Sequence, residues 1–217
     1  FVREKGDVQQ GFADADVVLE RTYYTQWAHQ TYLEPHTSLL DIDHDGKVQV
    51  WVASQSPLRN RQELARLTGL EPADIVINPT FVGGSFGGKI IAAELPVSYA
   101  IAKRIGQPVK FAMDYTEELM AAEPRHPSSL RVKAGIKRDG SLTAWESEVY
   151  FASGGYAAHA PTPPLYIIGI REIAGPYTIP HVRTDAFQVY TNTVPCGYAR
   201  APGGDQGIFA GESHLDE

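Results

Sequence analysis

A glycine-rich turn in the first half of the chain reads Gly83-Gly84-Ser85-Phe86-Gly87-Gly88-Lys89. A second turn, near the C-terminal end, reads Tyr198-Ala199-Arg200-Ala201-Pro202-Gly203-Gly204-Asp205-Gln206. Each turn follows a predicted strand and precedes a predicted helix. Glycine lets the backbone approach a ligand closely, and a helix N-terminus directs free N–H groups and the positive end of its dipole at an anion. Together the two turns predict a large anionic cofactor held by main-chain amides.

Paired strands surround these turns. Residues 37–43 and 47–53 flank Asp45-Gly46, a dipeptide typical of a tight hairpin turn. Residues 130–136 and 142–153 predict a second hairpin of the same kind. The chain therefore contains at least two antiparallel strand pairs.

Helices are predicted between the strand pairs. Ser56-Pro57 is typical of a helix start, and Gly69 is typical of a helix end. Residues 12–15 predict a short helical turn. A long helix is expected over residues 89–105, within which Pro96 predicts a kink or a late start. The alternation predicts an α+β fold, with a mixed β-sheet and helices packed on one face.

Composition limits the classes of function. The chain has 217 residues, 43% of them hydrophobic and 21% charged, which is ordinary for a globular protein. The net charge of −7 argues against a nucleic-acid partner, because phosphate backbones require basic patches. No apolar run approaches the roughly 20 residues that span a bilayer, so no membrane association is expected. Cys196 is the single cysteine, which excludes an internal disulfide and an iron–sulfur cluster held by this chain alone.

The two ends predict a piece of a longer polypeptide. The chain begins at Phe1 without a methionine or a basic, apolar leader, and residues 207–217 read as the opening of a helix. Because no secretory signal is visible, we expect a cytoplasmic protein.

The first turn also satisfies most of the P-loop pattern, from Gly83 to Gly88-Lys89. A P-loop needs Ser or Thr after the lysine to hold magnesium, and this chain has Ile90. Asp114 is a poor candidate for the second acidic group that nucleotide hydrolysis requires. The pattern therefore argues against nucleotide hydrolysis. A structural alternative remains, in which the glycines only allow tight packing of a helix on a strand.

The first turn resembles the Gly-Gly-x-Phe-Gly-Gly-Lys segment of the molybdenum hydroxylases, the xanthine dehydrogenase and aldehyde oxidase family. Three further segments agree in order and spacing. Gly6-Asp7-Val8 through Glu20 resembles the entry to that family's molybdopterin-binding region, and Leu33-Glu34-Pro35-His36 resembles its Leu-Glu-Pro-His strand. The segment from Ala199 to Gln206 is similar to its Phe-Arg-Gly-Phe-Gly-Gly-Pro-Gln loop. The resemblance covers essentially the whole chain.

The resemblance implies a fold of the molybdenum-cofactor-binding-domain type, with residues 1–217 as the N-terminal lobe of the molybdopterin-binding region. The implied cofactor is molybdenum-molybdopterin, which bacterial members often carry as the cytosine dinucleotide. The implied cofactor-binding residues are Gly84, Ser85, Phe86, Gly87, Gly88, Ala199, Arg200, Ala201, Gly203, Gly204 and Gln206. We expect no metal ligand from this chain. We also expect no catalytic residue, because the family's glutamate base lies in a second segment beyond Glu217.

These roles agree with the chemistry of the residues themselves. Backbone N–H groups stabilise anionic oxygen without a titrating group. Phe86 offers an apolar wall for a flat substrate, and Arg200 can hold phosphate or oxo oxygens through its planar guanidinium. An ordinary surface ion pair is the alternative role for Arg200. For Glu34 we expect a structural role as a hydrogen-bond acceptor rather than catalysis.

The implied reaction is hydroxylation of an aldehyde or N-heterocycle, with water as the oxygen source. Electrons would leave through iron–sulfur clusters and FAD on other domains or subunits. The expected partners are therefore the remainder of the molybdopterin subunit, an iron–sulfur subunit and an FAD subunit, and this lobe alone is expected to be inactive. A second hypothesis is a cofactor-free α+β module that serves only as an assembly surface.

Departures from the family pattern narrow the substrate. Purine-oxidising members carry a glutamate where this chain has Ile90 and a phenylalanine where it has Pro202. Their purine-anchoring arginine would fall near residues 161–165, which contain none. A site without these polar anchors favours aldehydes or less polar N-heterocycles over purines. Cys196 precedes Arg200 by four residues, which is a poor position for the active-loop cysteine of carbon monoxide oxidation; we expect a buried thiol.

Overall fold

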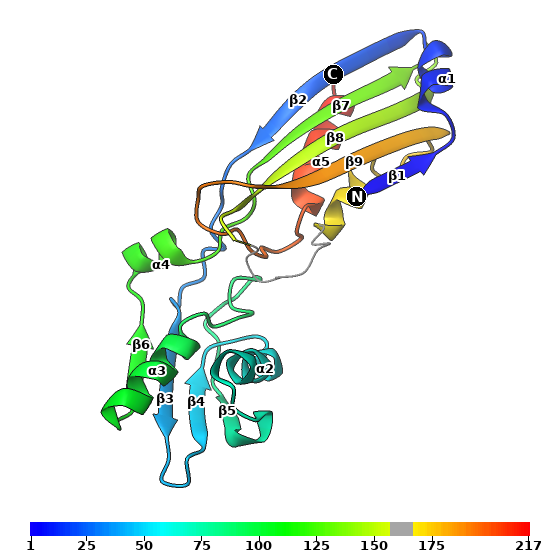
Figure 1. The fold of residues 1–217 in the computed structure, drawn as a ribbon. Helices are drawn as coiled ribbons and strands as arrows, with labels where there is room; N and C mark the ends of the chain where they lie inside the picture. The colour runs from blue at the N-terminus through cyan, green and yellow to red at the C-terminus, as the bar shows by residue number, and fades with distance from the viewer. Residues whose placement is uncertain (157–166) are drawn as a thin grey trace. The chain divides into compact units, whose positions relative to one another are not determined.

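The computed structural model describes residues 1–156 and 167–217, which form two compact units (Figure 1). The first combines Phe1–Ala28 with Pro124–Glu217 and contains a five-stranded sheet, so we call it the five-stranded unit. The second, His29–Glu123, contains a four-stranded sheet and is called the four-stranded unit. The chain thus leaves the first unit after β2, builds the second, and returns.

The sheet of the five-stranded unit has the strand order β1-β9-β8-β7-β2. Its strands are β1 (Val2–Lys5), β2 (Val17–Thr25), β7 (Ser128–Ile136), β8 (Leu142–Gly154) and β9 (His181–Tyr190). β7 and β8 form an antiparallel hairpin, whereas β8 and β9 run parallel, so the sheet is mixed.

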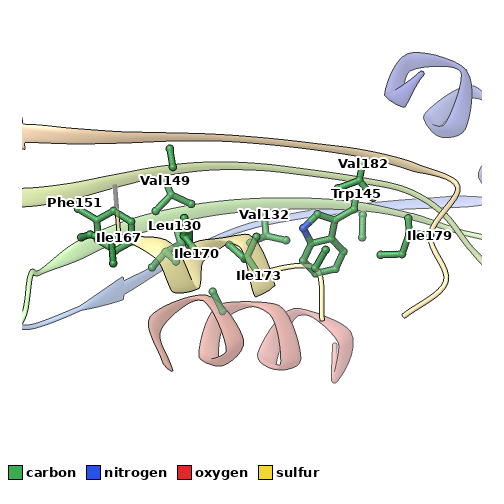
Figure 2. Packing of buried hydrophobic residues seen from close by; sticks show 14 residues of the cluster. Leu130, Val132, Trp145, Val149, Phe151, Ile167, Ile170, Ile173, Ile179 and Val182 are labelled. Carbon is green, nitrogen blue, oxygen red and sulfur yellow. The ribbon is translucent and has the colours of Figure 1, made fainter. Parts of the chain in front are cut away.

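The core of this unit lies between the sheet and the helix α5 (Gly204–Leu215), with η2 (Ile168–Glu172) beside it (Figure 2). Side chains alternate along β8, so Trp145, Val149 and Phe151 face this core and are fully buried. The short helix α1 (Val8–Ala13) packs at the other face, where Gly11 lies against Ala144.

The sheet of the four-stranded unit has the order β5-β4-β3-β6. Its strands are β3 (Thr37–Ile42), β4 (Val48–Val52), β5 (Ile75–Pro79) and β6 (Val109–Ala112). The helices α2 (Pro57–Thr68) and α3 (Leu95–Ile105) share one apolar core with it. The 3-10 turn η1 (Pro72–Asp74) leads into β5, and α4 (Tyr115–Ala121) follows β6. Because β4 and β5 are parallel and the other pairs antiparallel, this sheet is also mixed.

The α+β prediction with mixed sheets is confirmed, and the structure contains two such sheets. Both predicted hairpins form. The helix expected from residue 89 begins instead at Leu95, because Pro96 suits only the first turn of a helix. The turn expected at residues 12–15 lies earlier, in α1, where Asp7 accepts hydrogen bonds from the N–H groups of Gln9 and Gln10.

Helix α2 begins at Pro57 as predicted, although the Ser56 side chain makes no capping hydrogen bond. Gly69 ends α2 with a φ of 74°. Across residues 1–156 and 167–217, none of the helices has the length and apolar character needed to cross a bilayer.

Candidate functional site

The first glycine turn follows β5 in the four-stranded unit. Gly84 and Gly87 have φ values of 101° and 103°, which only glycine adopts without strain. Phe86 has a φ of 49°, which is uncommon for a bulky residue, and its side chain is half exposed. The turn closes through Gly88 N, which donates to Ser85 O at 2.9 Å. No helix begins directly after this turn, so the prediction that a helix dipole acts at this site is wrong.

Lys89, the last residue of the turn, anchors it through buried contacts. Its side chain is fully buried, and Nζ donates to Glu34 Oε2 at 2.7 Å. The ammonium also lies 4.7 Å from the centroid of the Tyr32 ring. The Lys89 ammonium is buried against Glu34 and Tyr32, so it is not placed to bind phosphate as a P-loop lysine would. This argues against the nucleotide-binding alternative.

Glu34 ties the turn to the segment that precedes β3. Its Oε2 also accepts from Gly83 N at 2.9 Å, and Glu34 N donates to Gly83 O at 3.3 Å. Desolvation acts to raise the pKa of Glu34, but the hydrogen bonds from Lys89 and Gly83 outweigh it and hold the pKa below its usual value. This agrees with the expected structural role of Glu34.

Asn60 fixes the chain just after the turn. Its Nδ2 donates to Ile90 O at 2.9 Å, and its Oδ1 accepts from Ala92 N at 2.7 Å. Gln55 N donates to Lys89 O at 3.0 Å. The backbone of residues 89–92, where the sequence predicted a helix, is instead hydrogen-bonded to Gln55 and to Asn60 in the first turn of α2.

The exposed edge of the turn presents unused donors. Within residues 1–156 and 167–217, the backbone N–H groups of Gly84, Ser85, Phe86 and Gly87 find no hydrogen-bond acceptor. Donors that are held rigidly and left unpaired are suited to an anionic ligand.

The second glycine turn lies in the five-stranded unit and opens directly into α5, as predicted. Gly203 has a φ of 76°, and its N–H donates to Gln206 Oε1 at 3.0 Å. Gln206 is buried, and its Nε2 donates to His126 O at 2.9 Å. Ala201 also has a positive φ, of 56°. This turn therefore sits at a helix N-terminus, where the dipole favours an anion.

Arg125 braces the second turn from outside it. Its Nη2 donates to Arg200 O at 2.7 Å, and its Nη1 forms an ion pair with Asp205. Arg200 itself is exposed, and no ion pair of its guanidinium is found among the described residues. The surface-ion-pair alternative for Arg200 therefore has no partner in the part of the chain that the structure describes.

The histidine and cysteine beside this turn are buried. Desolvation, with a further contribution from the nearby Arg125 cation, lowers the pKa of His126 to about 4, so the imidazole is neutral at pH 7. Cys196 is a buried free thiol, as expected. The range 161–165, where a purine-anchoring arginine would fall, lies outside the described residues.

Metal-ligand geometry is found in one place in the described ranges, at Asp43, His44 and Asp45 in the β3–β4 turn. Asp43 already accepts from Asp45 N and Lys47 N, as is usual in such turns. The hydrogen bonds of this tight turn account for the grouping of the three residues, which lie outside both glycine turns.

The predicted site residues fall into two groups. Gly84, Ser85, Phe86, Gly87 and Gly88 form one turn of the four-stranded unit. The others form one turn of the five-stranded unit, and they are Ala199, Arg200, Ala201, Gly203, Gly204 and Gln206. The sequence patterns did not reveal the residues that support them, Tyr32, Asn60 and Arg125. Their contacts join residues that are tens of positions apart, so local patterns carry no signal for them.

Comparisons with known proteins identify similar sequences and folds. A family model described as "Molybdopterin cofactor-binding domain" matches residues 1–217. The chain is 33% identical to a probable xanthine dehydrogenase subunit of Bacillus subtilis, covering 97% of this chain and 28% of that protein. It is 30% identical to the nicotinate dehydrogenase large molybdopterin subunit of Eubacterium barkeri, covering 98% of this chain and 50% of that protein. The solved aldehyde oxidoreductase of Desulfovibrio gigas matches with a TM-score of 0.86 and 28% identity, over 97% of this chain and 23% of that one.

Proposed function

The chain belongs to the molybdopterin cofactor-binding domain family, and we propose that residues 1–217 form the N-terminal lobe of the molybdopterin-binding region of a molybdenum hydroxylase. The chain spans half or less of the length of the curated relatives it matches. The remaining length would supply the rest of the cofactor site. The activity of the complete protein is therefore part of this proposal.

The observation that carries the proposal is the supply of unpaired donors in the two glycine turns. The first turn offers the N–H groups of residues 84–87, and the second offers the exposed guanidinium of Arg200, four residues before α5 begins. Molybdopterin is anionic through its phosphate and dithiolene groups. Rigid amides and an arginine fork suit such a ligand, so the residues present fit this cofactor.

The bound cofactor would supply oxidative hydroxylation, with water as the oxygen source. The residues of this chain bind and orient it. The amides of residues 84–87 donate to anionic oxygens from fixed positions, which requires little reorganisation. The ring of Phe86, half exposed and held at a positive φ, provides an apolar wall that limits access of water. Arg200 would hold a phosphate or oxo oxygen through its planar guanidinium. We assign no base to this chain.

We propose an aldehyde or a less polar N-heterocycle as the substrate. The support is the pair of apolar residues Ile90 and Pro202, which stand where purine-oxidising members carry a glutamate and a phenylalanine. A purine would leave its polar groups unpaired against such residues. The relatives are named for xanthine, nicotinate and aldehydes, so the choice among these classes rests on the two residues.

We further propose that the cofactor has the cytosine dinucleotide form and that electrons pass to iron–sulfur and FAD subunits in the cytoplasm. One relative is named a large molybdopterin subunit, which supports an assembly of several subunits. The second candidate function, a cofactor-free assembly module, makes the opposite prediction about bound metal.

The test is the molybdenum and pterin content of the complete subunit that carries this chain, purified from cells supplied with molybdate. We expect stoichiometric molybdenum by inductively coupled plasma mass spectrometry, together with pterin after oxidative release. Subunit without either would contradict the proposal and support the assembly module. An activity panel then compares an aromatic aldehyde, quinoline and xanthine, and we expect xanthine to be the poorest substrate. Preferred turnover of xanthine would contradict the substrate proposal alone.

A further inference from the structure

Residues 29–36, which precede β3 in the four-stranded unit, pack against the first glycine turn. A Cβ atom added to Gly84 would lie 2.8 Å from Tyr32 Cβ, and one added to Gly88 would lie 2.7 Å from Tyr32 Cε1. The Lys89 ammonium lies over the same ring. Tyr32 is itself buried. Tyr32 is therefore the residue against which the turn packs, through its Cβ atom at Gly84 and its ring at Gly88.

Tyr32 is also held by hydrogen bonds to two residues of α4. Tyr115 OH donates to Tyr32 O at 2.5 Å, and the Tyr32 hydroxyl donates to Glu118 Oε1. Glu118 is fully buried, and its Oε2 accepts from His36 N at 2.6 Å. One helix thus fixes both the backbone and the side chain of Tyr32.

The groups around Glu118 require a carboxylate. Its Oε1 also receives His36 Nδ1 at 2.8 Å, and His29 Nε2 lies 3.6 Å away. Desolvation acts to raise the pKa of Glu118, but the hydrogen bonds from Tyr32 and His36 outweigh it and hold the pKa below its usual value. An ionised carboxylate only accepts, so the Nδ1 atom of His36 carries the proton. An uncharged isostere would place an N–H₂ group against these donors.

We propose that Glu118 is a positioning residue for the cofactor turn. It acts through Tyr32 on residues 83–89 and touches no ligand itself. This rests on the proposed function, because the turn matters for catalysis only if it holds the cofactor. A buried carboxylate with several hydrogen-bond donors is strongly held. We therefore expect the chain of contacts from Glu118 in α4 through Tyr32 to the turn to be rigid. The unpaired amides of the turn are thereby kept at fixed positions.

The experiment uses Glu118→Gln in the complete subunit, with Glu63→Gln on the surface of α2 as the matched control. Acylation of lysines followed by peptide mass spectrometry reports on Lys89 whether or not cofactor is bound. We expect Lys89 to react roughly tenfold faster in the Glu118 variant, since an unsatisfied buried donor raises the population of open turn by about that factor. The Glu63 variant should react like the parent. Unchanged protection of Lys89 in the Glu118 variant overturns the proposal.

The molybdenum(V) electron paramagnetic resonance spectrum separates positioning from general destabilisation. We expect the Glu118 variant to show altered g-values in the cofactor that it retains, whereas destabilisation alone would lower only the amount of signal. A more reactive Lys89 with the parent spectrum and full molybdenum content overturns the role toward the cofactor. If the Glu118 variant does not fold, Tyr32→Phe decides by the same measurements, because it removes one hydroxyl and keeps the ring. Parent subunit without molybdenum contradicts the proposed function instead, and the Lys89 measurement still decides whether Glu118 holds the turn.

Discussion

The first glycine turn rests on a buried ion pair and an aromatic ring, whereas the second is packed closely against the segment around η2 at the start of α5. Beneath the first turn lie a buried lysine, a glutamate and a tyrosine ring. Against the second turn, a Cβ atom on Gly203 would lie 2.4 Å from Ile167 Cγ2, and one on Gly169 would lie 2.2 Å from Gly204 N. The second turn also opens into a helix, whose N-terminus supplies a positive potential that the first turn lacks. The two turns should therefore respond differently to mutation and to pH.

Gly203→Ala should give the largest loss of stability. The added methyl group meets Ile167, and the φ of 76° is strained for any L side chain, so we expect a loss of about 4 kcal/mol in the five-stranded unit. The matched control is Gly46→Ala, which has a φ of 80° and open space around its Cβ, and should lose only about 1 kcal/mol. Urea unfolding, monitored by hydrogen exchange, measures both losses of stability. Equal losses would show that the second turn is not held by close packing.

Lys89→Met should give the next largest loss, in the four-stranded unit. It removes a buried cation and leaves Glu34 without its partner, so we expect a loss of about 3 kcal/mol. Lys110→Met, at an exposed position of β6, is the control and should lose little. Hydrogen exchange resolved by peptide separates the two units. A Lys89 variant as stable as the control would mean that charge does not anchor the first turn.

The pH dependence of stability should also separate the units. The pKa of His126 falls to about 4 in the folded protein, against about 6.5 when unfolded. The unfolded state binds more protons between these values, so stability from the neutral imidazole is present above pH 6.5 and is lost as the pH falls to about 4, by about 3 kcal/mol. In the four-stranded unit the lowered pKa values of Glu34 and Glu118 place the loss below the ordinary value of 4.5.

The measurement is the urea midpoint of each unit between pH 7 and pH 3, with His126→Leu as the test of assignment. We expect this variant to flatten the slope of the five-stranded unit between pH 6.5 and pH 4 by about one proton. An unchanged slope would assign the titration to another group.

The smallest effect should be a gain. Ala201 has a positive φ of 56°, so Ala201→Gly relieves strain and should stabilise the five-stranded unit by about 1 kcal/mol. Thermal unfolding measures this gain. A loss would indicate that the entropy of the added glycine in the unfolded chain exceeds the relieved strain.

The elements that the sequence predicts well are those set by neighbouring residues. The Asp45-Gly46 hairpin and the end of α2 at Gly69 follow from local backbone preferences, and both form as expected. The family resemblance likewise depends on short contiguous motifs. Pro96 predicts either a kink or a late start of α3, and the structure has the late start.

The supports of the site could not be predicted from the sequence, because they join distant residues. Tyr32 and Glu118 are 86 positions apart, and Arg125 and Arg200 are 75 apart. Such contacts are created by the way the sheets fold and leave no periodic signal. A lysine after a glycine turn equally suggests a phosphate ligand or a buried ion pair, and only the position of Glu34 decides between them.

The central claim is that the glycine turns bind an anionic cofactor. The most direct test is the ratio of molybdenum to protein in the complete subunit with Arg200→Ala, compared with Arg138→Ala as an exposed arginine in the β7–β8 turn. Neither change should alter the melting temperature, since no ion pair of either guanidinium is found among the described residues. We predict that Arg200→Ala loses most of its molybdenum while Arg138→Ala retains it. Equal and full molybdenum content in both variants would contradict the account.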